Sequence, residues 1–166
     1  MKANSQQKAK ILVCGFKGET NSAKILLDKI STSNKIFLEN DMDKSVAQII
    51  DAIKDNTFDL VVQIGQGSGL VRCIDIEKSV SQGADVFMSN YDFTAMRNFL
   101  MDAGYHVNVT HENTNFLCNN AFFHTLKYIS ENNLKTQSIA IHIPSMSDSI
   151  LCKNKLAETL SEFLFC

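Results

Sequence analysis

The segment Asp59-Leu60-Val61-Val62-Gln63-Ile64-Gly65 has the strongest strand signal in the chain and determines the expected fold class. Its apolar character is nearly continuous rather than alternating, which is typical of a strand covered on both faces, as in parallel sheets. Short apolar runs predict three further strands, over Ile11–Val13, Lys35–Leu38 and Ser138–Ile143. These strands lie far apart in the chain, so the segments between them decide how they connect.

Helical patterns alternate with these strands. Apolar residues recur at helical spacing over Asn21–Ile30, where Asn21 or Ser22 is the expected N-cap, and over Asp43–Lys54, where Asp43 is. The remaining expected elements are helices over Tyr91–Ala103 (ending at Gly104), Cys118–Ser130 and Ser149–Phe165, a weaker strand over Tyr105–Thr110, and an edge or antiparallel segment at Ile74 and Ile76. We therefore expect one α/β domain over residues 1–166, a three-layer α/β/α sandwich with a mostly parallel (mixed) central sheet.

Composition excludes several classes of protein. The 166 residues are 45% hydrophobic and 20% charged, so the chain has enough apolar content to fold around a core. A net charge of −2 argues against a basic face for nucleic acid, and no apolar run reaches the roughly 18 residues of a membrane span. The polar N-terminus does not resemble a signal peptide. Five cysteines without a Cys-x-x-Cys pair indicate neither a disulfide framework nor a structural zinc site, so we expect a reducing, cytoplasmic location.

Ligands of open α/β sheets collect beyond the carboxyl ends of the strands. Four loops are expected there, over Gly15–Thr20, Gly65–Gly69, Thr110–Leu117 and Pro144–Asp148. Cys118 lies where the third of these loops turns into a helix, and the positive end of a helix dipole favours a thiolate. The alternative is a cysteine that simply packs as a small hydrophobe.

His142 lies near the carboxyl end of an apolar strand and is a candidate general base for a thiol. The alternative is a buried histidine with a purely structural role. His106, His111 and His124 compete for the catalytic role. His111 is expected in the loop before Cys118 and within its reach, whereas His124 is expected to face elsewhere.

Glu77 is a candidate for the carboxylate that orients the imidazole, and Asp75 is its rival. The alternative for both is a solvated surface charge. The turn Gly65-Gln66-Gly67-Ser68-Gly69 lacks the Lys-Ser/Thr ending of a P-loop, so a flavodoxin-like nucleotide binder ranks last. We interpret the turn as a close approach of backbone to ligand, with the Gln66 amide facing a polar substrate group.

Taken together, these segments resemble the pyroglutamyl peptidase I (pyrrolidone-carboxylate peptidase) family of cysteine peptidases. Asn115–Phe123 (NFLCNNAFF) is similar to the nucleophile segment of that family, and Ile141–Pro144 (IHIP) to its histidine segment. Gly65–Gly69 is similar to the glycine turn of the family, Ile76–Val80 to its glutamate segment, and Ile11–Phe16 to its first strand. The chain looks like a shortened member of the family.

The resemblance implies Cys118 as nucleophile, His142 as general base and acid, and Glu77 as the partner of the imidazole. It also implies that the substrate is bound by Gln66, Phe16, Asn21 and Leu117. Backbone N–H groups at the start of the Cys118 helix and from the glycine turn would stabilise the oxyanion. The implied substrate is a peptide blocked by an N-terminal pyroglutamyl group, with no metal, cofactor, nucleic acid or membrane. Homo-oligomers are common in the family, which the resemblance permits here.

Departures from the family pattern keep two alternatives open. The first loop, Phe16–Ser22, lacks the Pro and the second Phe that help to grip the lactam ring in the family. The segment between Glu77 and Cys118 is shorter than usual. One alternative is a binding or structural domain with an idle triad, and the other is a cysteine amidase with a different substrate.

Overall fold

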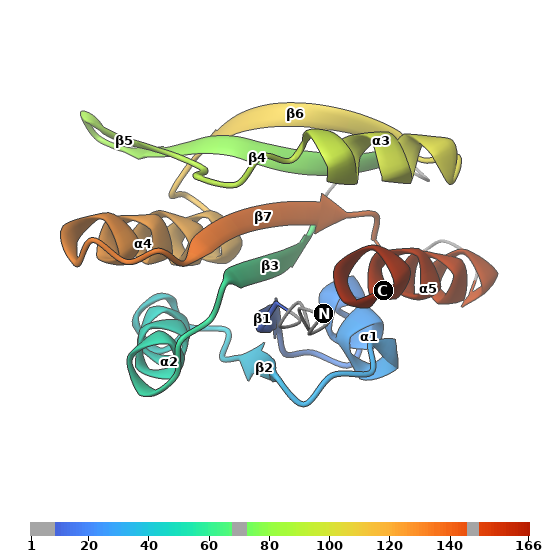
Figure 1. The fold of residues 1–166 in the computed structure, drawn as a ribbon, viewed down its shortest axis with the longest axis horizontal. Helices are drawn as coiled ribbons and strands as arrows, with labels where there is room; N and C mark the ends of the chain where they lie inside the picture. Colours follow the sequence, from blue (N-terminus) through green and yellow to red (C-terminus); the bar gives the residue numbers. More distant parts are fainter. Residues whose placement is uncertain (1–8, 68–72, 146–149) are drawn as a thin grey trace, which may run out of the picture.

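The computed structural model describes residues 9–67, 73–145 and 150–166, and in this part of the chain helices cover both faces of one seven-stranded sheet (Figure 1). The elements alternate as expected along most of the chain. In order they are β1 (Ile11–Phe16), α1 (Ser22–Lys29), β2 (Lys35–Leu38), α2 (Met42–Asp55), β3 (Leu60–Gln66), β4 (Cys73–Gln82), β5 (Asp85–Met88), α3 (Thr94–Asp102), β6 (His106–Asn113), α4 (Leu117–Glu131), β7 (Gln137–Ile143) and α5 (Ile150–Phe165). Among the described residues, no helix is both long enough and apolar enough to span a membrane.

The sheet has the order β2-β1-β3-β7-β4-β5, and β6 also pairs with β4. β2, β1, β3 and β7 run parallel to one another, whereas β4 is antiparallel to both β7 and β5 and parallel to β6. The sheet is therefore mixed and mostly parallel, as predicted. The strand 59–65, from which the prediction started, forms β3 between β1 and β7.

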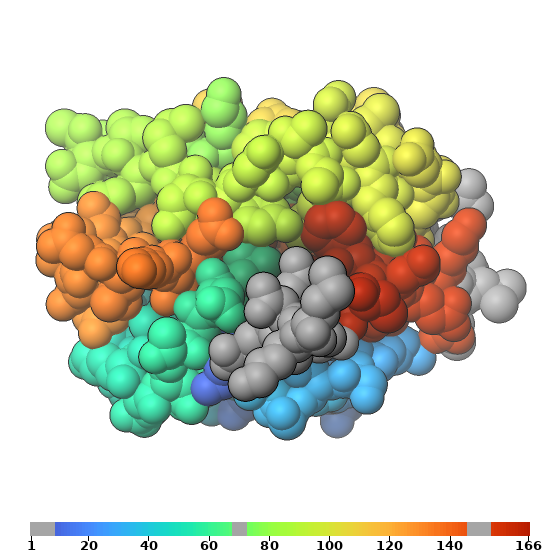
Figure 2. Space-filling view, viewed as in Figure 1, coloured from blue at the N-terminus to red at the C-terminus, as the bar shows by residue number. Residues whose placement is uncertain are grey.

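Side-chain alternation along the strands builds two cores. Val13 and Ile141 point to the face covered by α1, α3 and α5, where they pack with Leu27. Leu12 on β1 points to the opposite face, where it packs with Ile49 of α2. Figure 2 shows α3 lying against α5, and the β4–β5 region lying against α4, in agreement with the contacts between these elements. The predicted three-layer α/β/α sandwich is confirmed.

Two helices differ from the prediction in a way that has a clear local cause. Asp41 caps α2, because its backbone is extended and its Oδ1 accepts a hydrogen bond from the Lys44 N–H at 2.9 Å. The predicted cap, Asp43, lies inside the first turn. Helix α3 begins at Thr94 rather than at Tyr91. The carboxylate just before it, on Asp92, accepts a hydrogen bond from the Thr94 N–H at 3.0 Å in a local turn that precedes the helix.

The predicted edge segment at Ile74 and Ile76 is only partly right. β4 is antiparallel to β7, as one of the two predicted options required, but it is a long inner strand that pairs with β5, β6 and β7. β5, which the sequence analysis did not predict, is a short strand that pairs with β4 after a turn at Gly83, whose φ is +60°.

Candidate active site

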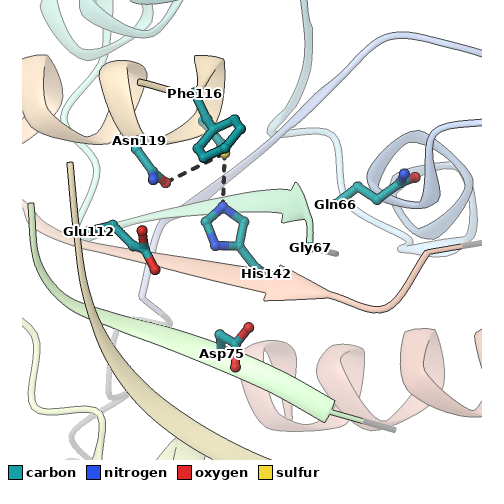
Figure 3. Close-up of a pocket in the computed structure, with 8 residues that line it drawn as sticks. Gln66, Gly67, Asp75, Glu112, Phe116, Asn119 and His142 are labelled. Carbon is teal, nitrogen blue, oxygen red and sulfur yellow. Dashed lines mark hydrogen bonds between the residues drawn. The ribbon is translucent and has the colours of Figure 1, made fainter. Parts of the chain in front are cut away.

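Cys118 and His142 meet at one end of the sheet, although 24 residues separate them in the chain. Cys118 is the second residue of α4, and His142 is the next-to-last residue of β7. His142 Nε2 and Cys118 Sγ form a hydrogen bond at 2.9 Å, which Figure 3 shows as the dashed line between the ring and the yellow sulfur. The sequence analysis treated these two residues as candidates, and the structure brings them together.

Glu77 contacts the second ring nitrogen of His142, Nδ1. Its Oε1 lies 2.7 Å from His142 Nδ1, and the side chain is only 1% exposed. The rival, Asp75, is the direct cross-strand neighbour of His142, but its Oδ1 accepts a hydrogen bond from Asn108 Nδ2 at 2.8 Å. The diagonal position of Glu77 on β4, opposite Ala140, is therefore the one that brings a carboxylate to Nδ1.

The surroundings of His142 favour its charged form. Burial lowers the pKa of this imidazole, but contacts with Cys118 and Glu77 outweigh burial and raise the pKa to about 10. Protonated imidazole is a donor at both nitrogens, so it donates toward Sγ through Nε2 and toward the Glu77 carboxylate through Nδ1. At neutral pH the ring of His142 is therefore protonated.

Gly65 makes room for this pair. A Cβ at position 65 would lie 2.4 Å from His142 Cδ2 and 3.1 Å from Cys118 Cβ. The close approach seen at this glycine is between β3 and the side chains of Cys118 and His142. A glycine at the end of an otherwise apolar strand was the available signal for such an approach. The predicted approach of the turn to a ligand stays a prediction. Ser68 and Gly69 of the same turn lie outside the described residues.

The competing histidines are placed elsewhere. His111 lies on β6 rather than in a loop, and its Nδ1 shares a hydrogen bond of 2.5 Å with Ser79 Oγ. His124 lies on α4 and stacks edge-on against Phe123, and His106 is exposed at the first position of β6.

Two cavities open beside the Cys118 sulfur. A cavity of about 370 Å³ is lined by all four residues expected to bind substrate, Phe16, Asn21, Gln66 and Leu117, together with Asn40, Met42, Gly65, Asn115, Phe116 and Cys118. A smaller cavity of about 210 Å³ is lined by Gln66, Gly67, Asp75, Glu112, Phe116, Cys118, Asn119 and His142. We call these the larger and the smaller cavity; Cys118 lines both, whereas His142 lines only the smaller one.

In two of the residues expected to bind substrate, the side-chain oxygen already accepts a hydrogen bond from the protein backbone. Gln66 Oε1 accepts a hydrogen bond from the Ser22 N–H at 2.8 Å, and Asn21 Oδ1 accepts one from the Ala23 N–H at 2.9 Å. Both oxygens therefore close the N-terminus of α1. The predicted contact of the Gln66 amide with a polar substrate group would therefore be made by its Nε2 group, because Oε1 is engaged.

Backbone donors for an oxyanion remain at the start of α4. The N-cap residue of this helix, Phe116, makes no side-chain capping hydrogen bond, and the first N–H groups of a helix have no partner within it. The expected contribution of the glycine turn is smaller, because the Gly67 N–H already donates to the Ile143 carbonyl at 2.8 Å.

The sequence analysis did not single out Glu112, Phe116 or Asn119, which complete the smaller cavity. Burial, followed by the nearby charge of Glu77, raises the pKa of the Glu112 carboxyl. Asn119 Oδ1 lies 3.5 Å from the Cys118 sulfur. Since Glu112 lies on β6, only knowledge of the β4–β6 pairing would have placed it beside His142.

Comparison with known proteins identifies the family and the fold of this chain. The family model for pyroglutamyl peptidases matches residues 71–161. The fold is similar to a crystal structure of pyroglutamyl peptidase I from Bacillus amyloliquefaciens, with a TM-score of 0.79 and 17% identity over 95% of this chain and 96% of that one. It is also similar to the pyrrolidone carboxyl peptidase from Thermococcus litoralis, with a TM-score of 0.74 and 15% identity over 94% of this chain and 92% of that one.

At these identities the structural likeness shows the fold alone, and no curated protein matches the chain in sequence. The family model covers more than half of the chain. The chain therefore belongs to the pyroglutamyl peptidase family of cysteine-type hydrolases.

Proposed function

We propose that the protein removes an N-terminal pyroglutamyl residue, or a related small acyl group, from peptides, with Cys118, His142 and Glu77 as its catalytic triad. The observation that carries the proposal is the continuous chain of contacts from Glu77 Oε1 through the imidazole to Cys118 Sγ, at 2.7 and 2.9 Å. A nucleophile in contact with a base that a third group orients is the arrangement required for acyl transfer through a covalent intermediate.

In the proposed reaction, the Cys118 sulfur attacks the carbonyl carbon of the pyroglutamyl group and forms a C–S bond. The carbonyl oxygen gains the negative charge, which the N–H groups at the start of α4, free of a side-chain cap, would stabilise. His142 then gives its Nε2 proton to the departing amine as the C–N bond breaks.

Hydrolysis of the resulting thioester completes the cycle. His142, now neutral, takes a proton from a water molecule, which attacks the acyl carbon and releases pyroglutamate and the Cys118 thiolate. Glu77 keeps the imidazole in one orientation through both steps. No step requires a cofactor, and a thiol nucleophile works only in its reduced form, which agrees with the predicted cytoplasmic location.

The larger cavity is the better place for the acyl group. It lies beside Cys118 and is lined by Phe16 and Leu117, which offer apolar surface to a small ring. The smaller cavity, which contains His142, then lies on the side from which the amine departs.

Hydrolysis of a fluorogenic pyroglutamyl amide tests the proposal. We expect turnover by the wild type and a loss of about a thousandfold or more in Cys118→Ser and His142→Ala, because residues that act as one unit fail together. Cys166→Ser is the matched control, since Cys166 is exposed at the C-terminus and lines neither cavity.

The remaining outcomes separate the alternatives. Absence of turnover, together with a Cys118 that iodoacetamide alkylates no faster than free cysteine, would favour a binding domain with an idle triad. Hydrolysis of other acyl amides but not of pyroglutamyl amides would identify a cysteine amidase with a different substrate.

A further inference from the structure

We propose that the smaller cavity binds the residue that follows the pyroglutamyl group, and that Asp75 and Glu112 make it select lysine or arginine there. This inference rests on the proposed function and adds to it the class of peptide that the enzyme prefers. It comes from the position of His142 relative to the two cavities and from the charge of the cavity walls.

The position of His142 assigns the two cavities. The departing nitrogen must receive the proton from His142 Nε2, so the leaving group has to lie on the same side of the sulfur as the imidazole. His142 lines the smaller cavity and not the larger one, whereas Cys118 lines both. The scissile bond therefore lies next to the Cys118 sulfur, between the two cavities. The acyl group occupies the larger cavity, and the following residue occupies the smaller one.

The walls of the smaller cavity are acidic. Asp75 on β4 and Glu112 on the neighbouring strand β6 both line it, and Figure 3 shows their carboxylates near the His142 ring. The charge of His142 offsets that of Glu112 only in part, because the imidazole lies against Glu77 and the sulfur, and burial together with Glu77 still raises the pKa of Glu112. Within the described part of the chain, neither Asp75 nor Glu112 has a lysine or arginine within ion-pair distance.

Each carboxylate would gain from a cation. Asp75 has only neutral donors, Asn108 and the Cys73 thiol, on its Oδ1. Glu112 is partly buried and close to the charge of Glu77, and both circumstances raise its pKa. A lysine or arginine side chain of the substrate would supply the opposite charge that these groups lack, whereas an acidic side chain would be repelled.

Phe116 adds a second kind of contact for a basic side chain. It lines the smaller cavity, and the residue is 66% exposed although it lies two positions before Cys118. An aromatic face beside two carboxylates attracts a lysine or arginine head by cation–π interaction and covers its methylene stem.

Competition between matched dipeptide amides tests the selection. We would measure kcat/KM for pyroglutamyl-lysine amide, pyroglutamyl-norleucine amide and pyroglutamyl-glutamate amide by chromatography of the released amino acid amide. Norleucine has nearly the same shape as lysine without the charge. We expect lysine to be preferred over norleucine by about fivefold, as for a partly exposed charge pair, and glutamate to be the poorest substrate.

Charge variants show which residues cause the preference. Glu112→Gln and Asp75→Asn should each reduce the ratio of lysine to norleucine, and Glu112→Lys should shift the preference toward glutamate. Asp85→Asn is the matched control, because it removes one negative charge from β5, outside both cavities, and should leave the ratio unchanged.

The outcomes distinguish this inference from the proposed function. Hydrolysis of all three amides at equal rates, or a preference that Glu112→Gln and Asp75→Asn leave unchanged, would overturn the acidic subsite while the peptidase proposal stands. If none of the three pyroglutamyl amides is hydrolysed, the proposed function fails and the inference fails with it.

Discussion

At position 65 a single hydrogen atom occupies the space beside Cys118 and His142. The Cβ of an alanine there would lie 2.4 Å from His142 Cδ2 and 2.7 Å from Nε2, far inside van der Waals contact. The ring would have to move, and its 2.9 Å contact with the sulfur would be lost. For Gly65→Ala we expect a loss in kcat/KM of about a hundredfold or more, since misplacement of about 1 Å has this effect, and a destabilisation of about 1–3 kcal/mol.

Gly15→Ala is the control for this variant. A Cβ at position 15 would lie 3.1 Å from a Leu27 methyl group, on the face of the sheet that α1 covers. It should therefore lower stability without moving His142, so thermal unfolding changes while kcat/KM does not. A Gly65→Ala enzyme with the activity of the Gly15→Ala enzyme would show that the imidazole does not need this space.

The pKa of His142 predicts how stability depends on pH. Its folded-state value of about 10 lies above the ordinary value of 6.5, so its charged form contributes stability below about pH 6.5 and loses this contribution as the pH rises through 10. Glu77→Gln removes one cause of the raised pKa. We therefore expect the difference in free energy of unfolding between wild type and Glu77→Gln to be largest near pH 6 and to shrink toward pH 10.

Urea unfolding at pH 6, 8 and 10 measures this difference. Lysines, tyrosines and other cysteines titrate in both proteins, so their contributions largely cancel in the comparison. A difference that stays constant or grows over this range would mean that Glu77 does not stabilise a charged imidazole.

At the residue scale, sequence reasoning proposed Cys118 as the nucleophile and His142 as the base, but it could not choose between Glu77 and Asp75 from the residues alone. Both side chains lie on the same face of β4, and Asp75 is even the direct neighbour of His142. The choice depends on the reach of the longer side chain along the diagonal and on Asn108, which engages Asp75 from a different strand. Neither fact is visible before the strands are paired.

At the scale of elements, the absence of a side-chain capping hydrogen bond at the start of α4 is the feature with the clearest chemical consequence. Phe116 occupies the N-cap position with an extended backbone and no side-chain hydrogen bond. Serine at this position would accept a hydrogen bond from the N–H of Cys118 or Asn119 and would stabilise the helix by about 1 kcal/mol. The same bond would occupy a donor that the proposed reaction needs for the oxyanion, so we expect Phe116→Ser to be more stable but less active than Phe116→Ala.

The comparison with Phe116→Ala is essential, because both variants lose the aromatic ring and differ only in the hydroxyl group. Thermal unfolding and kcat/KM with pyroglutamyl-norleucine amide would be measured for both. Equal activity of the two variants, with serine more stable, would show that these N–H groups do not contribute to the reaction.

The elements that sequence patterns predicted correctly are those with an uninterrupted apolar signal. β1, β2, β3 and β7 have continuous apolar runs, the helices between them have apolar residues at helical spacing, and all formed where expected within a few residues. The length of β4 was underestimated because the strand contains a bulge between Glu77 and Ser79. Ile76 therefore packs on the side of α1, α3 and α5 while Val80 packs beneath α4, and the alternation that indicates a strand is interrupted.

At the scale of the whole molecule, the candidate site depends on long-range pairing. Glu77, Cys118 and His142 come from β4, α4 and β7, and the antiparallel insertion of β4 next to β7 brings the first to the third. The family resemblance identified these residues without the topology, whereas Glu112 and Gly65 required the assembled sheet. Since Cys118 packs against the same core cluster as Cys14 of β1, loss of the fold and loss of the site are expected to coincide.

The cysteines allow this coincidence to be measured. Cys14 is fully buried, and burial raises the pKa of its thiol, so it should resist alkylation until the sheet opens. Cys118 should be alkylated rapidly only while His142 is in place, and the exposed Cys166 serves as the reference at every urea concentration. In a brief iodoacetamide pulse read by peptide mass spectrometry, we expect Cys118 to lose its enhanced rate and Cys14 to become reactive at the same urea midpoint, as one cooperative domain over residues 1–166 requires. If Cys118 loses its enhanced alkylation rate at a clearly lower urea concentration than the one at which Cys14 becomes reactive, α4 and its contacts open locally before the sheet unfolds.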